Sequence, residues 1–80
     1  MATPKIGIVV QFHEYGTIVP AMVVADHSTW SSEMFGWSDG TAQPDSGTIM
    51  IAAFDATTPT YYTDVAEGTG DGEYSLIPLL

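Results

Sequence analysis

The stretch from Gly16 to Asp26 limits the folds open to this chain more than any other. It begins with a turn residue and continues as Thr-Ile-Val-Pro-Ala-Met-Val-Val-Ala-Asp, a run rich in β-branched and apolar side chains. Such residues favour a pleated, half-buried surface, so we expect the central strand of a small β domain. Both faces of this strand are apolar. One face should therefore meet a core, and the other should meet a second layer or a partner protein.

Pro20 interrupts this predicted strand. Proline has no backbone N–H and cannot donate a ladder hydrogen bond, so within sheets it is confined to edges, strand ends and bulges. We therefore expect the strand at Pro20 to lie at an edge, or at a bulge where it bends from one sheet into another. Such a bend is what a small closed barrel requires.

Four further segments have the length and composition of short strands separated by turn residues. The first alternates strictly, with Ile6, Ile8, Val10 and Phe12 on one face. A loop from His27 to Gly47 lacks any periodicity. We predict an all-β fold, a small five-stranded SH3-like barrel with one long loop, because closing a sheet removes exposed edges. The four segments are Lys5–Phe12, Thr48–Phe54, Thr60–Val65 and Glu73–Ile77.

The chain has 80 residues, the length of one small domain. We expect residues 1–4 to form an N-terminal arm and residues 5–80 to form a single domain. A chain of this size buries only about 60 to 65% of the surface of its unfolded form, so its stability should be small. Since the chain has no cysteine to form a disulfide, we expect association into a homo-oligomer to supplement that stability.

Ten acidic side chains and a single basic one, Lys5, give a formal net charge of −9. Such a surface repels phosphate, so we expect no binding to DNA or RNA. No apolar run approaches the ~20 residues of a membrane span, and no basic, apolar leader opens the sequence. We therefore expect a soluble protein without a membrane partner or a signal peptide. The apolar content of 45% predicts an apolar area that faces a partner.

The long loop carries four large apolar side chains, Trp30, Met34, Phe35 and Trp37. Aromatic residues are enriched in interface hot spots, and four such side chains exceed what capping a small barrel needs. They form the first candidate partner interface. Some of them should cap the open end of the barrel instead, so interface and core plug both stay open, with different residues able to take each role.

A short helical turn fits within this loop. Ser31 or Ser32 could cap its start, and Gly36 would end it after Phe35. The end of the sequence is a second candidate interface, because an apolar terminus is costly in water and should dock onto its own barrel or onto a neighbouring subunit. Its apolar candidates are Leu76, Ile77, Leu79 and Leu80.

Two pairs of possible metal ligands stand out. His13 adjoins Glu14 in a predicted turn, and Asp26 adjoins His27 at the far end of the next strand. A metal site needs three or four convergent ligands, whereas the two ends of a hairpin lie apart. We therefore predict exposed turn histidines and no metal site. Calcium is the alternative at the acidic turns, although their spacing matches no EF-hand, and solvated acids explain them: Asp39, Asp45, Glu67, Asp71 and Glu73.

The sequence contains no recognisable catalytic constellation. Ser28, Ser31 and Ser32 follow His27 but lack the glycine-flanked elbow that exposes a nucleophile. One lysine without any arginine leaves little positive charge to stabilise an oxyanion or a phosphate. The glycine-rich segment 67–72 is acidic and no lysine follows it, so it is no phosphate cradle. We predict that the protein is not an enzyme and holds no cofactor.

Three segments carry a family resemblance. They are Gly16, Pro20, Ala21 and Val23 in the second predicted strand, the apolar run Ile49–Phe54, and the glycine-rich residues 67–70 that lead to Tyr74. In these segments the chain resembles a family of short proteins encoded by tailed bacteriophages and prophages. The resemblance implies a small SH3-like barrel that serves in the virion, as a capsid decoration (cement) protein or as a head-to-tail connector part.

The first hypothesis is a capsid decoration protein. It would be made in the host cytoplasm, bind the major capsid protein on the outer surface of the phage head, form homo-oligomers there and stabilise the shell by mass action. The alternative is a head-tail connector or tail component, which copy number would separate from a shell protein. A hypothesis of another class is an acidic inhibitor that imitates nucleic acid, motivated by the charge of −9.

Overall fold

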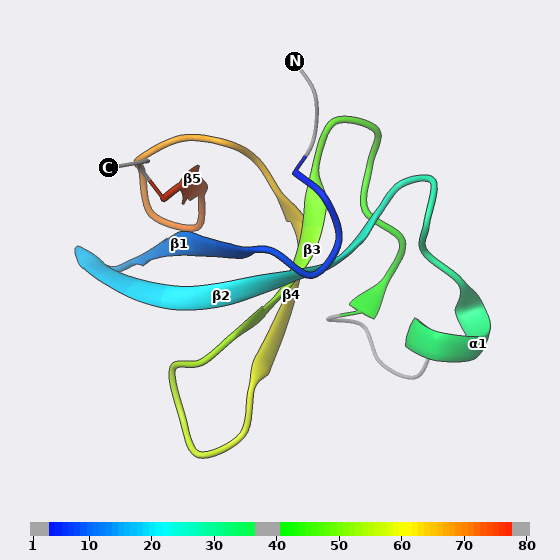
Figure 1. Cartoon of the computed structure of the whole chain (residues 1–80), viewed down its shortest axis with the longest axis horizontal. Helices are drawn as coiled ribbons and strands as arrows, with labels where there is room; N and C mark the ends of the chain where they lie inside the picture. Colours follow the sequence, from blue (N-terminus) through cyan, green and yellow to red (C-terminus); the bar gives the residue numbers. More distant parts are fainter. Residues whose placement is uncertain (1–3, 37–40, 78–80) are drawn as a thin grey trace.

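The computed structural model describes residues 4–36 and 41–77. Five strands form one antiparallel sheet in the order β4-β3-β2-β1-β5 (Figure 1). The all-β prediction is confirmed, including the number of strands. The elements are β1 (Val9–Glu14), β2 (Thr17–Asp26), α1 (Ser32–Phe35), β3 (Ile49–Ala53), β4 (Thr60–Val65) and β5 (Tyr74–Leu76).

The sheet is curved and barrel-like, but it is not closed. The two strands at its ends, β4 and β5, form no ladder with each other. The chain just after β4 instead meets β5 through one parallel bridge between Glu67 and Tyr74. Two backbone hydrogen bonds support this bridge, from Gly68 N–H to the Tyr74 carbonyl (2.8 Å) and from Tyr74 N–H to the Ala66 carbonyl (3.0 Å). The predicted closed barrel is therefore corrected to an open one with a single bridge at its seam.

The main core lies inside the curve of the sheet. Side chains alternate across a strand, so every second residue of β1, β2 and β3 points into it. Tyr62 on β4 is half-buried against this core, and its ring centroid lies 4.9 Å from that of Phe12 on β1. The buried members are Val10, Phe12, Val19, Ala21, Val23, Ile49, Ile51, Ala53, Val65 and Tyr74.

The first strand begins later than its alternation predicts. Gly7 has a φ of 93°, and both the Gly7 N–H and the Ile8 carbonyl hydrogen bond to Val23. Gly7 and Ile8 thus together oppose the single residue Val23. This is a β-bulge of the type whose first residue is a glycine in the left-handed conformation. Because the chain turns here, Ile6 and Ile8 are exposed, and the prediction that they share the buried face of Val10 is wrong.

Pro20 lies inside β2, which is central in the sheet. It is tolerated because it sits at the last rung toward β3, where its carbonyl accepts the Phe54 N–H (2.9 Å). The register shift in this strand lies farther on, between Val23 and Ala25. No bend therefore lies at Pro20 itself, although β2 does contain a bulge. On the β3 side, Pro20 lies just beyond the last register pair, Ala21–Ala53, so the strand is locally at an edge there.

This bulge reverses the side of the sheet toward which β2 points. Val23 faces Ile51 in the main core, whereas Ala25 faces Met50 in a second core on the other face. Phe35 of α1 completes the second core, whose buried members are Ala25, Phe35 and Met50. Val24 and Trp30 are partly buried and pack against it. Figure 1 shows α1 at the end of the molecule away from β5.

Candidate functional site

The aromatic loop packs against the sheet beside the bulge, not across the end of the main core. Trp30 is half-buried, and its Nε1–H donates to the Thr41 carbonyl oxygen (2.7 Å). The Thr41 hydroxyl in turn donates to the Phe35 carbonyl oxygen. Phe35 is buried, so two of the four predicted interface residues form the second core. The loop residues expected at the open end of the barrel thus cover the opposite face of the sheet.

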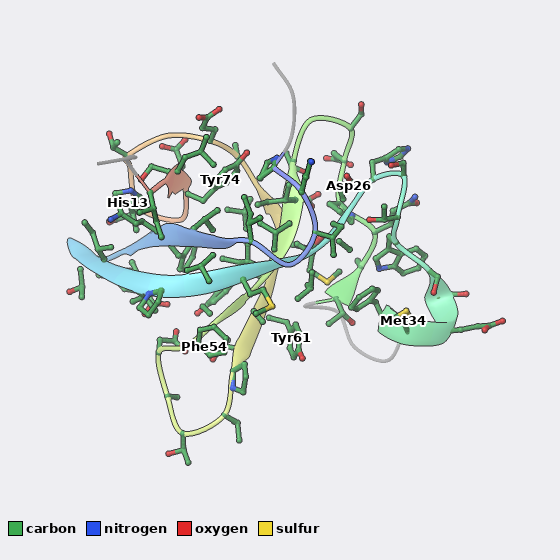
Figure 2. The ribbon with its side chains drawn as sticks, viewed as in Figure 1. His13, Asp26, Met34, Phe54, Tyr61 and Tyr74 are labelled. Carbon is green, nitrogen blue, oxygen red and sulfur yellow. The ribbon has the colours of Figure 1, made fainter. Side chains whose placement is uncertain are left out.

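Met34 differs from its neighbour Phe35. It lies on the outer side of the single helical turn, 66% exposed, and Figure 2 shows it at the edge of the molecule. Ser31 caps this turn by accepting the Met34 N–H, and Gly36 ends it, as the sequence predicts. The predicted interface residue Trp37 lies outside the described residues.

The C-terminal candidates lie at the other end of the sheet. Leu76 pairs with Val10 at the edge of the sheet, and both Leu76 and Ile77 are about half exposed. Neither side chain docks into the core of its own chain, which the sequence left as one of two possibilities. Leu79 and Leu80 lie outside the described residues.

An exposed apolar area that the sequence analysis did not single out lies on the outer face of the sheet. Register pairs join four strands in one row, from Val9 to Met22, from Met22 to Ala52 and from Ala52 to Tyr61. Val9 and Met22 are exposed, as are three more apolar residues beside them, and Figure 2 shows Phe54 and Tyr61 on the same side of β2. We call Val9, Ile18, Pro20, Met22 and Phe54 the outer apolar face.

The outer apolar face could have been found from the sequence. Most of it is the second face of β2, whose first face forms the core, and the sequence analysis noted that both faces of this strand are apolar. The sequence did not indicate which part of this outer face the long loop covers. The second core covers the Ala25 and Met50 end of this face and leaves the end at Val9 and Ile18 exposed.

A cavity of about 270 Å³ opens where the sheet is not closed. Phe12 and Tyr62 belong to the core behind it, and Glu14, Tyr15 and Asp71 bring it two carboxylates and one exposed ring. No basic side chain lines it. The lining residues come from β1, the β1–β2 turn, β4 and the turn before β5: Phe12, Glu14, Tyr15, Tyr62, Thr63, Val65, Asp71 and Gly72.

The polar groups of this cavity are held in place by hydrogen bonds. The Tyr62 hydroxyl donates to Glu14 Oε2 (2.8 Å) and lies 3.3 Å from Asp55 Oδ2. The bond to Glu14 is the main reason that the pKa of Tyr62 is raised above its ordinary 10.0, and burial adds to the effect. Asp71 Oδ1 accepts the Gly16 N–H (3.2 Å), which ties the turn before β5 to the β1–β2 hairpin.

The two histidines lie at opposite ends of the hairpin, as the sequence predicts, and each has a structural partner. His27 is the expected exposed turn residue, whereas the same prediction for His13 is wrong, because His13 lies within β1 and is half-buried. His27 Nδ1 donates to the Pro44 carbonyl oxygen (3.0 Å), a bond that helps to fix the long loop. His13 Nε2 lies 2.8 Å from Ser75 Oγ on β5, a pairing that the sequence analysis did not consider. Figure 2 shows His13 near β5.

The His13–Ser75 pair does not have the arrangement of an activated nucleophile. The Ser75 hydroxyl lies between His13 Nε2 (2.8 Å) and Gln11 Oε1 (3.4 Å) and hydrogen bonds with both side chains. Within residues 4–36 and 41–77, no carboxylate is seen to orient the His13 ring. Ser28, near His27, hydrogen bonds with Asp26 instead.

The acidic turns use their carboxylates to organise the backbone. Glu73 Oε1 accepts the Gly70 N–H (2.8 Å), and Asp64 Oδ1 accepts the Asp45 N–H (2.8 Å). Across the described part of the chain, no three histidine or acidic side chains gather in a way that could hold a metal ion. Asp39, one of the calcium candidates, lies outside the described residues.

Comparison of the chain with protein-family models, with curated proteins and with solved structures finds no match. In the two described ranges, no helix has the length and apolar character needed to cross a membrane. Function must therefore be inferred from the surfaces and the cavity of this chain.

Proposed function

We propose that this chain is a non-enzymatic structural protein of a tailed-phage virion, a capsid decoration protein that binds the major capsid protein on the outside of the head. The observation that supports the proposal best is the outer apolar face. Exposed apolar patches on small proteins mark sites of protein association. A protein that binds the assembled shell and not its free subunits makes disassembly less favourable by mass action.

The shape of the domain suits such a role. Most of the outer apolar face lies on β1 and β2, whose inner faces pack in the core, and Phe54 follows β3 directly, so its backbone is fixed by strand pairing before binding. Rigid surfaces lose little conformational entropy on association. The resemblance to phage proteins supplies the kind of partner, and the apolar face supplies the means of contact.

Copy number is the direct test. Mass spectrometry of purified virions should find this chain in a simple ratio to the major capsid protein. A handful of copies per particle would instead favour the connector or tail alternative. Absence from the virion would contradict the proposal and favour the inhibitor hypothesis, in which the acidic surface imitates nucleic acid.

The contact surface can be tested on shells that lack the protein. Purified chain is added back, and the bound amount is measured after sedimentation. Val9→Ser and Phe54→Ser should each reduce binding, because both remove apolar area from the outer apolar face while leaving the core intact. Ile6→Ser is the matched control, since Ile6 is equally exposed but lies in the turn before β1.

The same assay tests the interface residues that were predicted from the sequence. Met34→Ser tests the helical turn, and Leu76→Ser tests the C-terminal strand, each at an exposed apolar side chain. Loss of binding in Leu76→Ser with full binding in Phe54→Ser would move the contact to the C-terminal strand. Circular dichroism of each variant separates lost binding from lost folding.

A further inference from the structure

We infer that the cavity at the open seam of the sheet binds the guanidinium group of an arginine side chain presented by a partner protein. This inference goes beyond the proposed virion role and does not depend on it. The cavity and the outer apolar face are formed by different residues. The argument rests on the charge, the aromatic surface, the size and the backbone geometry of the cavity.

Charge selects a cation. Glu14 and Asp71 line the cavity, and Asp55 lies behind the Tyr62 hydroxyl at 3.3 Å. The chain as a whole carries a formal charge of −9, and its single basic side chain, Lys5, precedes β1, whereas Glu14 ends it. The carboxylates of the cavity thus have no cationic side chain of their own chain lining the cavity with them. An external cation would supply the missing charge.

The aromatic surface selects the kind of cation. Phe12 and Tyr62 form an inner wall, with ring centroids 4.9 Å apart, and Tyr15 lies at the mouth. A guanidinium is planar, stacks on aromatic faces and presents its N–H donors in a fork that matches carboxylates. An ammonium is a compact, strongly hydrated charge that makes less use of aromatic walls. The cavity therefore suits arginine better than lysine.

The size of the cavity suits a small ligand. Sites for cofactors and drug-sized molecules have volumes of roughly 300–1,000 Å³, most of it enclosed. The cavity here is about 270 Å³, which is below that range. A single side chain fits such a cavity, and a side chain arrives as part of a partner protein.

The position of Tyr15 supports a binding role. Tyr15 and Gly16 form a two-residue hairpin turn, with φ values of 51° and 80°. This turn type favours Asn or Gly at its first central position, because other residues are strained there. Tyr15 nevertheless occupies it, and the residue is 88% exposed, so burial within its own chain does little to offset this strain. A strained, exposed aromatic residue beside a cavity is a feature that binding explains.

The test uses the whole chain and three tripeptide amides, acetyl-Gly-Arg-Gly, acetyl-Gly-citrulline-Gly and acetyl-Gly-Lys-Gly. Citrulline keeps the shape of arginine but removes its charge. Amide chemical shifts are followed by NMR at matched ionic strength. The arginine peptide should cause saturable shifts at Tyr15, Gly16, Thr63 and Gly72, with a dissociation constant on the order of millimolar for so small a ligand.

Neutral variants then locate the site. The double variant Glu14→Gln, Asp71→Asn keeps oxygen acceptors for Tyr62 and Gly16, so the fold should persist while the dissociation constant rises at least about tenfold. Glu33→Gln is the matched control, because it removes one charge from the exposed side of α1 and should leave binding unchanged.

Three results with the natural chain would overturn the inference. These are the absence of saturable shifts with the arginine peptide, equal shifts with the citrulline peptide, and equal affinity for the lysine peptide. Unchanged affinity in the double variant would likewise place the peptide elsewhere. The spectrum of the remaining amides reports whether each variant is folded.

Discussion

The hydroxyl of Tyr62 on β4 donates a 2.8 Å hydrogen bond to Glu14 Oε2 on β1, although two strands separate β4 from β1 in the sheet. The contact is possible because the sheet curves until its inner faces meet. The ring of Tyr62 also packs against Phe12. One residue thus joins β4 to β1, which do not pair with each other, by both an apolar and a polar contact.

Replacing Tyr62 by Phe should separate these two contacts. The ring and its packing remain, but Glu14 loses its donor. Because the acceptor is charged and only partly shielded from water, we expect the free energy of unfolding to fall by about 1–2 kcal/mol. Urea denaturation followed by tryptophan fluorescence measures the change. Tyr62→Ala, which also removes the ring, should cost clearly more, and equal losses would show that the packing of the ring contributes nothing beyond the hydroxyl.

The Tyr62–Glu14 bond also predicts how stability depends on alkaline pH. The pKa of Tyr62 is raised in the folded chain, chiefly by its bond to Glu14, so the folded state favours the protonated phenol. The resulting stabilisation is complete below the unfolded value of 10.0 and is lost as pH rises above it toward the folded pKa. Urea denaturation from pH 8 to pH 11 should therefore show a smaller decline in Tyr62→Phe than in the natural chain. Parallel declines would contradict this assignment.

A substitution in the β1–β2 turn should raise the stability of the fold and weaken binding at the cavity. Asn adopts a positive φ more readily than Tyr, so Tyr15→Asn should raise the free energy of unfolding by about 0.5 kcal/mol. The same change removes the ring at the mouth of the cavity and should weaken binding of the arginine tripeptide. Thermal denaturation and the NMR titration measure the two effects. A variant that gains stability and binds as before would assign Tyr15 no role in the cavity.

Truncation of two neighbouring residues of α1 should change the free energy of unfolding by very different amounts. Phe35 is 9% exposed and packs on Met50, so Phe35→Ala should lower the free energy of unfolding by about 3 kcal/mol. Met34 is 66% exposed, and Met34→Ala should change it by less than about 0.5 kcal/mol. Urea denaturation of both variants checks this. Similar effects at the two positions would show that the second core adds little to global stability.

Much of the fold could be predicted from the sequence because its strands have strong local signals. The range Thr60–Val65 is reproduced without change, and Gly16 lies in a turn as expected, with a φ of 80°. The start of β1 could not be predicted from alternation alone. Ile6 and Ile8 fit the pattern of the strand, but the bulge at Gly7 is decided by its pairing with Val23, which is a tertiary contact.

The candidate site was less predictable for the same reason. Whether Phe35 and Trp30 were interface or core depended on the bulge between Val23 and Ala25, which turns Ala25 toward a second core. The cavity was harder still, because it joins Glu14, Tyr62 and Asp71 from three distant segments. Each is unremarkable locally, as a turn acid or a strand tyrosine, and the curvature of the sheet brings them together.

Asp26 ends β2 and organises the start of the long loop. Its Oδ1 accepts hydrogen bonds from the backbone N–H and the hydroxyl of both Ser28 and Thr29, at 2.9–3.0 Å. The hydrogen bond from the Ser28 hydroxyl is the largest cause of the lowered pKa of this carboxyl. Asp26→Ala removes all four bonds and should lower the free energy of unfolding by about 1–2 kcal/mol at neutral pH.

The pH dependence of Asp26 distinguishes its charge from its packing. Because its pKa is lowered in the folded chain, its stabilisation is present above the unfolded value of 3.8 and is lost as pH falls below it. The destabilisation caused by Asp26→Ala should therefore shrink as the pH of the urea denaturation falls through this range. Glu33→Gln, at an exposed position of α1, should run parallel to the natural chain throughout. If the effect of Asp26→Ala is the same at acid and neutral pH, the ionised carboxylate is not what holds the loop, and packing around Trp30 must supply that order instead.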